Sequence, residues 1–99
     1  MTSVEITNSK RNDKRFQAVF YDKDGKKIKT TQFGLKNPKI GTFIDHQNNK
    51  IKQNYLKRHI KNENWNDFYS AGSLSRFILW NLPTYEQSFK DYKKRFKLK

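Results

Sequence analysis

Two histidines and three carboxylates are the side chains of this chain that come nearest to a catalytic set. His46 and His59, with Asp45 and several Asn nearby, are the residue types of a metal-dependent nuclease, in which a histidine base and metal ligands surround one cation. Such a site needs its ligands to converge, and the spacing of Asp45, Glu63 and Asp67 does not bring them together. We therefore predict no catalytic residue, no metal and no cofactor, and we interpret both histidines as structural or capping residues.

A second set of carboxylates, Asp22-Lys23-Asp24-Gly25, is similar to the start of a calcium loop but lacks the later ligands and the closing Glu. It suits a tight turn instead, with Gly25 at positive φ. Apolar residues alternate over Phe16–Phe20, and Lys27–Phe33 is expected to return as the second strand of a hairpin. A further short strand is expected over Val4–Asn8.

The register of this hairpin depends on its turn. If Gly25 forms a bulge after a type I turn, Phe20 faces Ile28, which places Ile28 on the apolar face of the strand. A two-residue turn would instead pair Tyr21 with Ile28. We favour the bulge because it adds Ile28 to the core.

Helical spacing replaces strand spacing in the second half of the chain. Leu35–Ile44 is predicted to be a connector broken at Asn37-Pro38. A helix capped by Asp45 or Asn48 then runs to about Lys61 and turns three side chains inward: Ile51, Tyr55 and Leu56.

Two further helices are expected after an irregular segment from Asn62 to Gly72. Ser73 is predicted to cap a short helix through Trp80 that buries three side chains: Leu74, Phe77 and Ile78. Thr84 begins the last helix, with Gln87 completing a capping box. This helix carries an aromatic stripe at helical spacing: Tyr85, Phe89, Tyr92 and Phe96.

The predicted fold is α+β, a small N-terminal antiparallel sheet (the hairpin plus the third strand) followed by three helices. The 99 residues form a single domain, with a β-rich part at 1–34 and a helical part at 45–97. Cysteine is absent, which excludes disulfides and thiolate metal sites. No apolar run reaches the ~20 residues that span a bilayer, so we expect no membrane partner.

The charge is the strongest guide to function. Lys and Arg number 22 against 9 acidic residues, a net charge of +13. Such a charge indicates a polyanionic partner, with duplex DNA first, although an AT-rich genome would also favour lysine on an ordinary solvated surface. The predicted phosphate contacts lie on the first and last helices: Lys50, Lys57, Arg58, Lys61, Lys90, Lys93, Lys94 and Lys97.

Arginine is scarce, so Arg58 and Arg76 stand out. Arginine forms planar, two-pronged pairs that lysine cannot form. One interpretation is that both clamp phosphates. The other is internal bracing, with Arg76 paired to Asp67 or Glu63.

Both arginines belong to an ordered pattern: Arg58-His59, Trp65, Ala71-Gly72, Ser75-Arg76, Leu79-Trp80-Asn81 and Pro83-Thr84. Over roughly Phe33 to Phe89 this pattern resembles a family of small basic proteins of nucleocytoplasmic large DNA viruses, the giant viruses. The resemblance implies a viral protein that acts in the virion, or in the host cytoplasm or nucleus during infection. We predict that most of the motif is aromatic core and caps rather than functional surface: His59, Trp65, Gly72, Ser75, Arg76, Trp80, Asn81, Pro83 and Thr84.

We therefore predict a non-enzymatic basic protein that binds DNA without sequence preference, or packages the genome in a large DNA virus particle. The alternative is an interaction protein that docks an acidic viral or host protein through charge complementarity. An exposed sheet edge along Val4–Asn8 would also permit a homodimer by strand addition.

Overall fold

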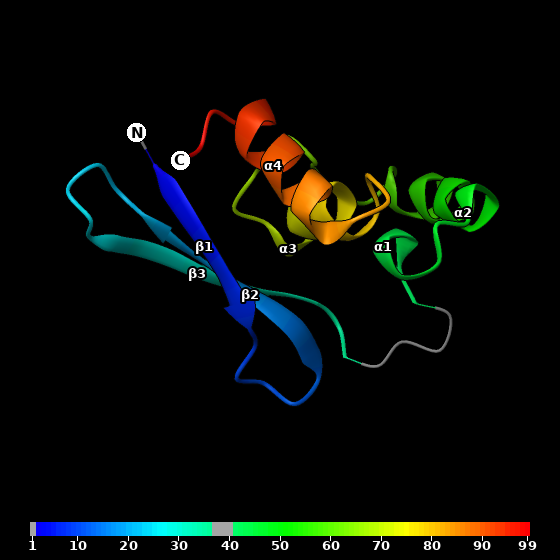
Figure 1. Cartoon of the computed structure of the whole chain (residues 1–99), viewed down its shortest axis with the longest axis horizontal. Helices are drawn as coiled ribbons and strands as arrows, with labels where there is room; N and C mark the ends of the chain where they lie inside the picture. The colour runs from blue at the N-terminus through cyan, green and yellow to red at the C-terminus, as the bar shows by residue number, and fades with distance from the viewer. Residues whose placement is uncertain (1, 37–40) are drawn as a thin grey trace.

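A computed structural model describes residues 2–36 and 41–99 of the chain (Figure 1). Its elements follow in this order: β1 (Ser3–Asn8), β2 (Lys14–Tyr21), β3 (Lys27–Leu35), α1 (Phe43–His46), α2 (Asn49–His59), α3 (Ala71–Leu74), the π-helix η1 (Ser75–Leu79) and α4 (Tyr85–Arg95). The α+β prediction is confirmed, with the one-turn helix α1 as an addition. The predicted break at Asn37-Pro38 lies outside the described residues. None of the described helices is long and apolar enough to cross a membrane.

The sheet has the order β1-β2-β3, with both pairs antiparallel. Figure 1 shows the sheet as one layer with the helices gathered on one side of it. The side chains that β1, β2 and β3 send towards the helices include Val4, Ala18, Phe20 and Phe33, all buried. The alternation seen in the sequence of β2 therefore identifies its inner face.

The predicted turn at Asp22–Gly25 is confirmed. Gly25 has φ +83°, and its N–H donates to the carbonyl of Asp22. The Asp22 side chain also accepts from the backbone N–H groups of Asp24 and Lys26, so the carboxylate shapes the turn. The predicted pairing of Phe20 with Ile28, however, is wrong.

A second bulge next to the turn shifts the pairing of β2 with β3 between Tyr21 and Phe20. Phe20 consequently pairs with Lys29, and Ile28 becomes the extra residue, 46% exposed. The core positions of β3 are taken by Thr31 and Phe33 instead. A one-residue slip exchanges the two faces of a strand, which is why Ile28 misses the core.

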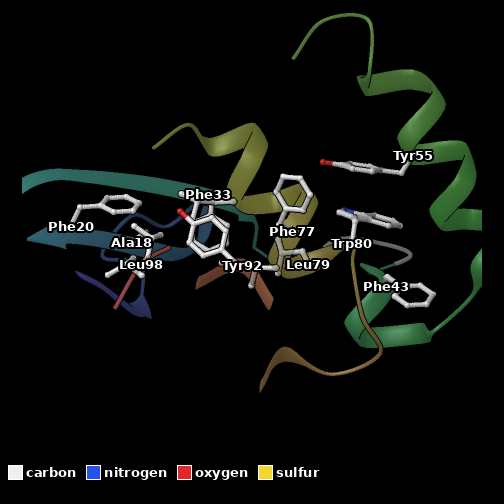
Figure 2. Packing of buried hydrophobic residues seen from close by; sticks show 13 residues of the cluster. Ala18, Phe20, Phe33, Phe43, Tyr55, Phe77, Leu79, Trp80, Tyr92 and Leu98 are labelled. Carbon is white, nitrogen blue, oxygen red and sulfur yellow. The ribbon is translucent and has the colours of Figure 1, made fainter. Parts of the chain in front are cut away.

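Aromatic rings from the helices fill the space against the sheet (Figure 2). The predicted stripe of α4 is confirmed, because Tyr92 is fully buried and its neighbours Tyr85, Phe89 and Phe96 pack against the core. Further from the sheet, Trp80 stacks on Tyr55 of α2 with ring centroids 4.3 Å apart and planes 7° apart. This stack joins α2 to the remainder of the core.

The capping residues of the two long helices are the predicted ones, but the Gln87 side chain does not complete the predicted capping box. Asn48 caps α2 by accepting from the N–H of Ile51, and the Thr84 hydroxyl accepts from the N–H of Gln87. The predicted cap at Ser73 is wrong, because Ser70 caps α3 three residues earlier. Ser73 is fully buried, and its hydroxyl donates to the carbonyl of Asn64.

The predicted helix through Trp80 becomes a π-helix in its second half. The Trp80 N–H donates to the carbonyl of Ser75, five residues back, at 3.0 Å. Each π-turn holds more residues than an α-turn, so a longer run of side chains can face the core. Leu79 and Trp80 are therefore buried together with the predicted Phe77 and Ile78.

The irregular segment between α2 and α3 is held from two sides. The Tyr92 hydroxyl of α4 donates to the carbonyl of Phe68 at 2.6 Å. The Thr31 hydroxyl of β3 donates to the next carbonyl, that of Tyr69, at 2.7 Å. Two neighbouring backbone acceptors thus depend on two buried hydroxyls.

The edge of β1 is not fully open, which corrects the prediction of a free edge along Val4–Asn8. The Lys99 N–H donates to the carbonyl of Thr2 at 2.9 Å, and the Val4 N–H donates to the carbonyl of Lys99 at 3.2 Å. Leu98 beside it is buried in the core. The last residues therefore cover one end of the edge that a second copy would need.

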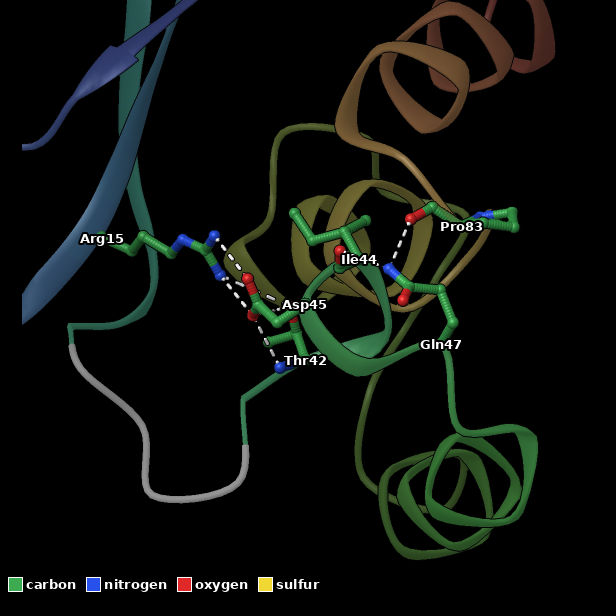
Figure 3. Close-up of polar contacts among 6 residues, drawn as sticks. All are labelled: Arg15, Thr42, Ile44, Asp45, Gln47 and Pro83. Carbon is green, nitrogen blue, oxygen red and sulfur yellow. Dashed lines mark hydrogen bonds and ion pairs between the residues drawn. The ribbon is translucent and has the colours of Figure 1, made fainter.

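An ion pair fastens the helical part to the sheet (Figure 3). The two terminal guanidinium nitrogens of Arg15 on β2 donate to the carboxylate oxygens of Asp45 in α1, at 2.8 and 2.9 Å. Asp45 is not an N-cap, as was one prediction, but the third residue of α1, where it forms a capping box with Thr42. Hydrogen bonding by the Arg15 side chain, opposed by burial and aided by the N–H of Thr42, lowers the pKa of Asp45 to about 2.

This depressed pKa predicts an acid-dependent contribution to stability. A carboxylate with a lower pKa in the folded state stabilises the fold above its unfolded pKa of about 4. We expect Asp45→Asn to lower the free energy of unfolding by about 1 kcal/mol at pH 6, through the weakened cap and the lost ion pair. That difference should shrink between pH 4 and pH 2, as measured by urea unfolding at each pH.

Asp13→Asn is the matched control. Asp13 pairs with Arg11, but both side chains are well exposed. Its loss should cost less than about 0.5 kcal/mol at any pH. A difference for Asp45→Asn that stayed constant from pH 6 to pH 2 would contradict the assigned ion pair.

Candidate functional site

The ion pairs of the protein leave its lysines out. Within residues 2–36 and 41–99, three arginine–carboxylate ion pairs form, with Arg11, Arg15 and Arg95, and Nδ1 of His59 lies 3.3 Å from an oxygen of Glu63. No lysine in this part of the chain lies within 4.0 Å of a carboxylate oxygen. The positive charge on these lysines is therefore not neutralised by nearby acids.

The eight predicted contact residues divide between two surfaces. The α2 surface comprises Lys50, Lys57, Arg58 and Lys61, all exposed. The α4 surface comprises Lys90, Lys93, Lys94 and Lys97, exposed except for the partly buried Lys93, whose ammonium lies 4.6 Å from the ring centroid of Phe89. Figure 1 shows α2 at the end of the molecule away from the termini, set apart from α4. The two surfaces are thus separate.

Lys52, also on α2, has an internal role. Its ammonium donates to the carbonyl of Asn81 at 2.7 Å and lies 4.7 Å from the ring centroid of Phe43. Burial, with the nearby Arg76 as a second cause, lowers the pKa of Lys52. Lys52 is therefore a structural lysine, unlike the exposed lysines of the same helix.

Arg76 braces the fold, as one interpretation held, but its predicted acidic partners are wrong. Its guanidinium donates to the carbonyl of Trp80 at 3.1 Å and lies over the rings of Trp65 and Phe77, 5.4 and 5.1 Å from their centroids. Burial, followed by the charge of Arg95, lowers the pKa of Arg76. Aromatic faces and a carbonyl take the place of Asp67 or Glu63.

Glu63 lies instead between two other members of the sequence motif. One carboxylate oxygen is 3.3 Å from Nδ1 of His59, and the other accepts from Nε1 of Trp65 at 3.0 Å. Gly72 faces this carboxylate, since a Cβ there would lie 3.0 Å from Cδ of Glu63. The motif glycine therefore leaves room for the acid.

His59 also joins a column of rings. It stacks on Tyr55 with centroids 4.1 Å apart, and Tyr55 in turn stacks on Trp80. His46 meets the Trp80 ring at 5.7 Å, and its Nδ1 accepts from the N–H of Asn48. Both histidines are therefore held by structural contacts.

A pocket of about 440 Å³ opens beside this column. Seven residues of the motif line it: Arg58, His59, Ala71, Gly72, Ser75, Leu79 and Trp80. Residues outside the motif complete its polar part, Lys14 from β2 and Glu63 from the segment after α2. Sequence reasoning missed Lys14, because a separation of more than forty residues gives no local signal. The pair of His59 and Glu63, four residues apart, could have been found.

The remaining motif residues serve the fold. The Asn81 amide donates to Asp91 at 2.7 Å, and the Pro83 carbonyl accepts from Gln47 at 3.0 Å (Figure 3). Thr84 is the cap of α4. Among the described residues, no group of three or more His, Asp or Glu is placed to hold a metal ion.

No curated protein and no solved structure matches the chain. A family of unknown function, DUF5754, matches residues 4–59, which include the sheet, α1 and α2 with Arg58 and His59. The match ends at His59, so every motif residue from Trp65 onwards lies beyond it. Because it covers more than half of the chain, the protein belongs to the DUF5754 family of unknown function.

Proposed function

We propose that the protein binds nucleic acid, duplex DNA in the first place, through its exposed lysines and without reading base sequence. The observation that carries this proposal is that no lysine of the described chain has an acidic partner within 4.0 Å, whereas most of the acids are engaged by arginine, histidine, indole, amide or backbone groups: Asp13, Asp22, Asp45, Glu63, Asp67 and Asp91. Unpaired lysines on a +13 chain favour a partner that supplies phosphates.

The dimensions of the molecule suit such a partner. Its longest extent is 42 Å, over which a duplex carries about 25 phosphate charges. A charge of +13 would neutralise about half of them. Coating or packaging the genome of a large DNA virus, in the particle or in the infected cell, would use this same property and forms part of the proposal.

Affinity for a random-sequence duplex, measured across a salt titration, tests the proposal. We expect a steep linear fall of log K with log salt concentration, since each neutralised phosphate contributes about −0.9 to the slope. Replacing three lysines of the α2 surface with glutamine (Lys50, Lys57 and Lys61) should make that slope shallower by about 3.

The matched control removes the same charge from the hairpin turn by changing Lys23, Lys26 and Lys27 to glutamine. These side chains are exposed too, but they lie at the far end of the sheet. An equal loss in both triple variants would contradict a defined α2 surface. No binding of the native protein near physiological salt would overturn the proposal altogether.

Docking to an acidic protein is the second candidate, and one observation favours it. Ile60 is 60% exposed at the end of α2, between residues of the basic α2 surface. An apolar side chain within a basic rim is typical of a protein interface rather than of phosphate contact. Capture of an acidic protein that Ile60→Ser weakens, without DNA binding, would support this candidate.

A further inference from the structure

We propose that the pocket between β3, α2 and η1 binds a nucleoside monophosphate, either free or as the phosphorylated end of a strand. Its volume of about 440 Å³ lies within the range of about 300–1,000 Å³ found for small-molecule sites. The inference goes beyond the proposed function, since Arg58 is the single residue that the pocket shares with the α2 surface.

The charge in the pocket favours an anion. Lys14 and Arg58 contribute two cations to its lining, against the single carboxylate of Glu63. Both oxygens of Glu63 are already engaged, by His59 and by Trp65. Neither cation forms an ion pair within the described chain, so both are available to a phosphate.

A serine hydroxyl completes a phosphate site. Ser75 lines the pocket at the start of the π-helix, and its hydroxyl can donate to a phosphate oxygen. The donors of Lys14, Arg58 and Ser75 come from three separate segments, as is usual in sites that fix one orientation of a ligand.

The remaining wall is apolar and partly aromatic. It comprises Phe33, Leu35 and Leu79 together with the stacked pair Tyr55 and Trp80. Both faces of Tyr55 are taken by His59 and Trp80, so the wall offers ring edges and the Leu35 side chain, which is 66% exposed. Inorganic phosphate would leave this wall unused, whereas a planar base can pack against it while its phosphate meets the cations. The lining therefore indicates a phosphate attached to a flat ring.

The motif supports the same inference. Because Gly72 has no Cβ, it leaves room for the Glu63 carboxylate. That carboxylate in turn holds His59 at the pocket. Within the described residues, the side chains of Ser75 and Arg58 form no hydrogen bond or ion pair. A binding site explains why residues of these types surround one pocket.

Titration of the ¹⁵N-labelled full-length protein with AMP, followed by NMR, tests the proposal. We expect saturable shifts at the amides of Gly72, Ser75 and His59. Lys14→Gln should weaken AMP binding about tenfold, the loss expected for one charge-assisted contact. Lys10→Gln, the same change in the exposed turn before β2, should leave the affinity within about twofold. Ser75→Ala provides a second pocket variant if Lys14→Gln proves to be less stable.

Four further probes separate the alternatives. Adenosine and inorganic phosphate should each bind at least about tenfold more weakly than AMP, and equal affinity for either would overturn the assignment. A tetranucleotide with a 5′-phosphate is compared with the same strand bearing a 5′-hydroxyl. Pocket shifts with the phosphorylated strand alone assign the ligand as a strand end, whereas shifts with AMP assign a free nucleotide.

Shifts confined to the lysines of α2 and α4, or an equal loss in Lys10→Gln and Lys14→Gln, would overturn the pocket proposal. Neither result bears on duplex binding, which the salt titration measures separately. Failure of the duplex titration alongside pocket shifts with AMP would overturn the proposed function and leave the pocket assignment in place.

Discussion

Replacing Trp80 with alanine is expected to lower the free energy of unfolding by about 3–5 kcal/mol, the usual cost of deleting a buried aromatic side chain. Trp80 is 8% exposed and stacks on Tyr55 on one side, with the His46 ring at 5.7 Å. Without it, α1 and α2 lose the ring that connects them to η1. Small domains are stable by only about 5–15 kcal/mol, so a substantial fraction of the variant should be unfolded at 37 °C.

Urea unfolding followed by circular dichroism measures this loss. Trp80→Phe keeps a ring against Tyr55 and should recover about half of it. Leu82→Ala is the control, because Leu82 is 36% exposed and its truncation should cost less than about 1 kcal/mol. If Trp80→Ala cost no more than Leu82→Ala, the stack would not be what holds α2 in place.

Removing the two hydroxyls that hold the segment between α2 and α3 should produce the next largest effect. Thr31→Val and Tyr92→Phe nearly preserve shape, but each leaves a carbonyl of that segment, at Tyr69 or Phe68, without its donor. A buried acceptor left unpaired costs about 1–3 kcal/mol. We expect about 1–2 kcal/mol from each single variant and about 2–4 kcal/mol from the double variant.

Hydrogen exchange locates this effect as well as measuring it. In the double variant, amides of residues 62–70 should lose protection before those of the sheet, because both anchors act on that segment. Gln17→Leu on β2, which removes a side-chain hydrogen bond to Gln32 outside this segment, provides the comparison. Uniform loss of protection across the chain would contradict a local anchoring role.

Local signals in the sequence predicted much of the fold. Three kinds of local feature are confirmed: the turn at Gly25, the caps Asn48 and Thr84, and the aromatic stripe of α4. In each of them, successive residues of the pattern are at most four positions apart in the sequence. Side-chain caps and helical periodicity act over three or four residues, so a single sequence contains them in full.

The errors arose where distant contacts decide. Ile28 leaves the core because the sheet as a whole prefers Phe33 opposite Phe16, which no turn rule contains. The choice of Ser70 over Ser73 as a cap follows from burial of Ser73 against the carbonyl of Asn64. In each case tertiary packing overrode a local preference that was reasonable by itself.

The site was predictable in composition but not in arrangement. The predicted contact lysines of α2 and α4 are exposed except for the partly buried Lys93, yet the sequence did not indicate that the two helices lie apart. One of the two interpretations of Arg76 pairs it with an acid, because charges are visible in a sequence, whereas its contacts are a carbonyl and two rings. The pocket depends on Lys14 meeting α2 and η1, a contact that only the folded chain creates.

The pairing of Lys99 with Thr2 and Val4 places the two ends of the described chain side by side. A short linker could join its ends, and new ends could be opened in the polar turn between Asn8 and Lys14. The spatial order of the elements would not change in such a circular permutant. The two termini also form one attachment point, so a label or fusion at either end reports from the same corner of the sheet, away from α2.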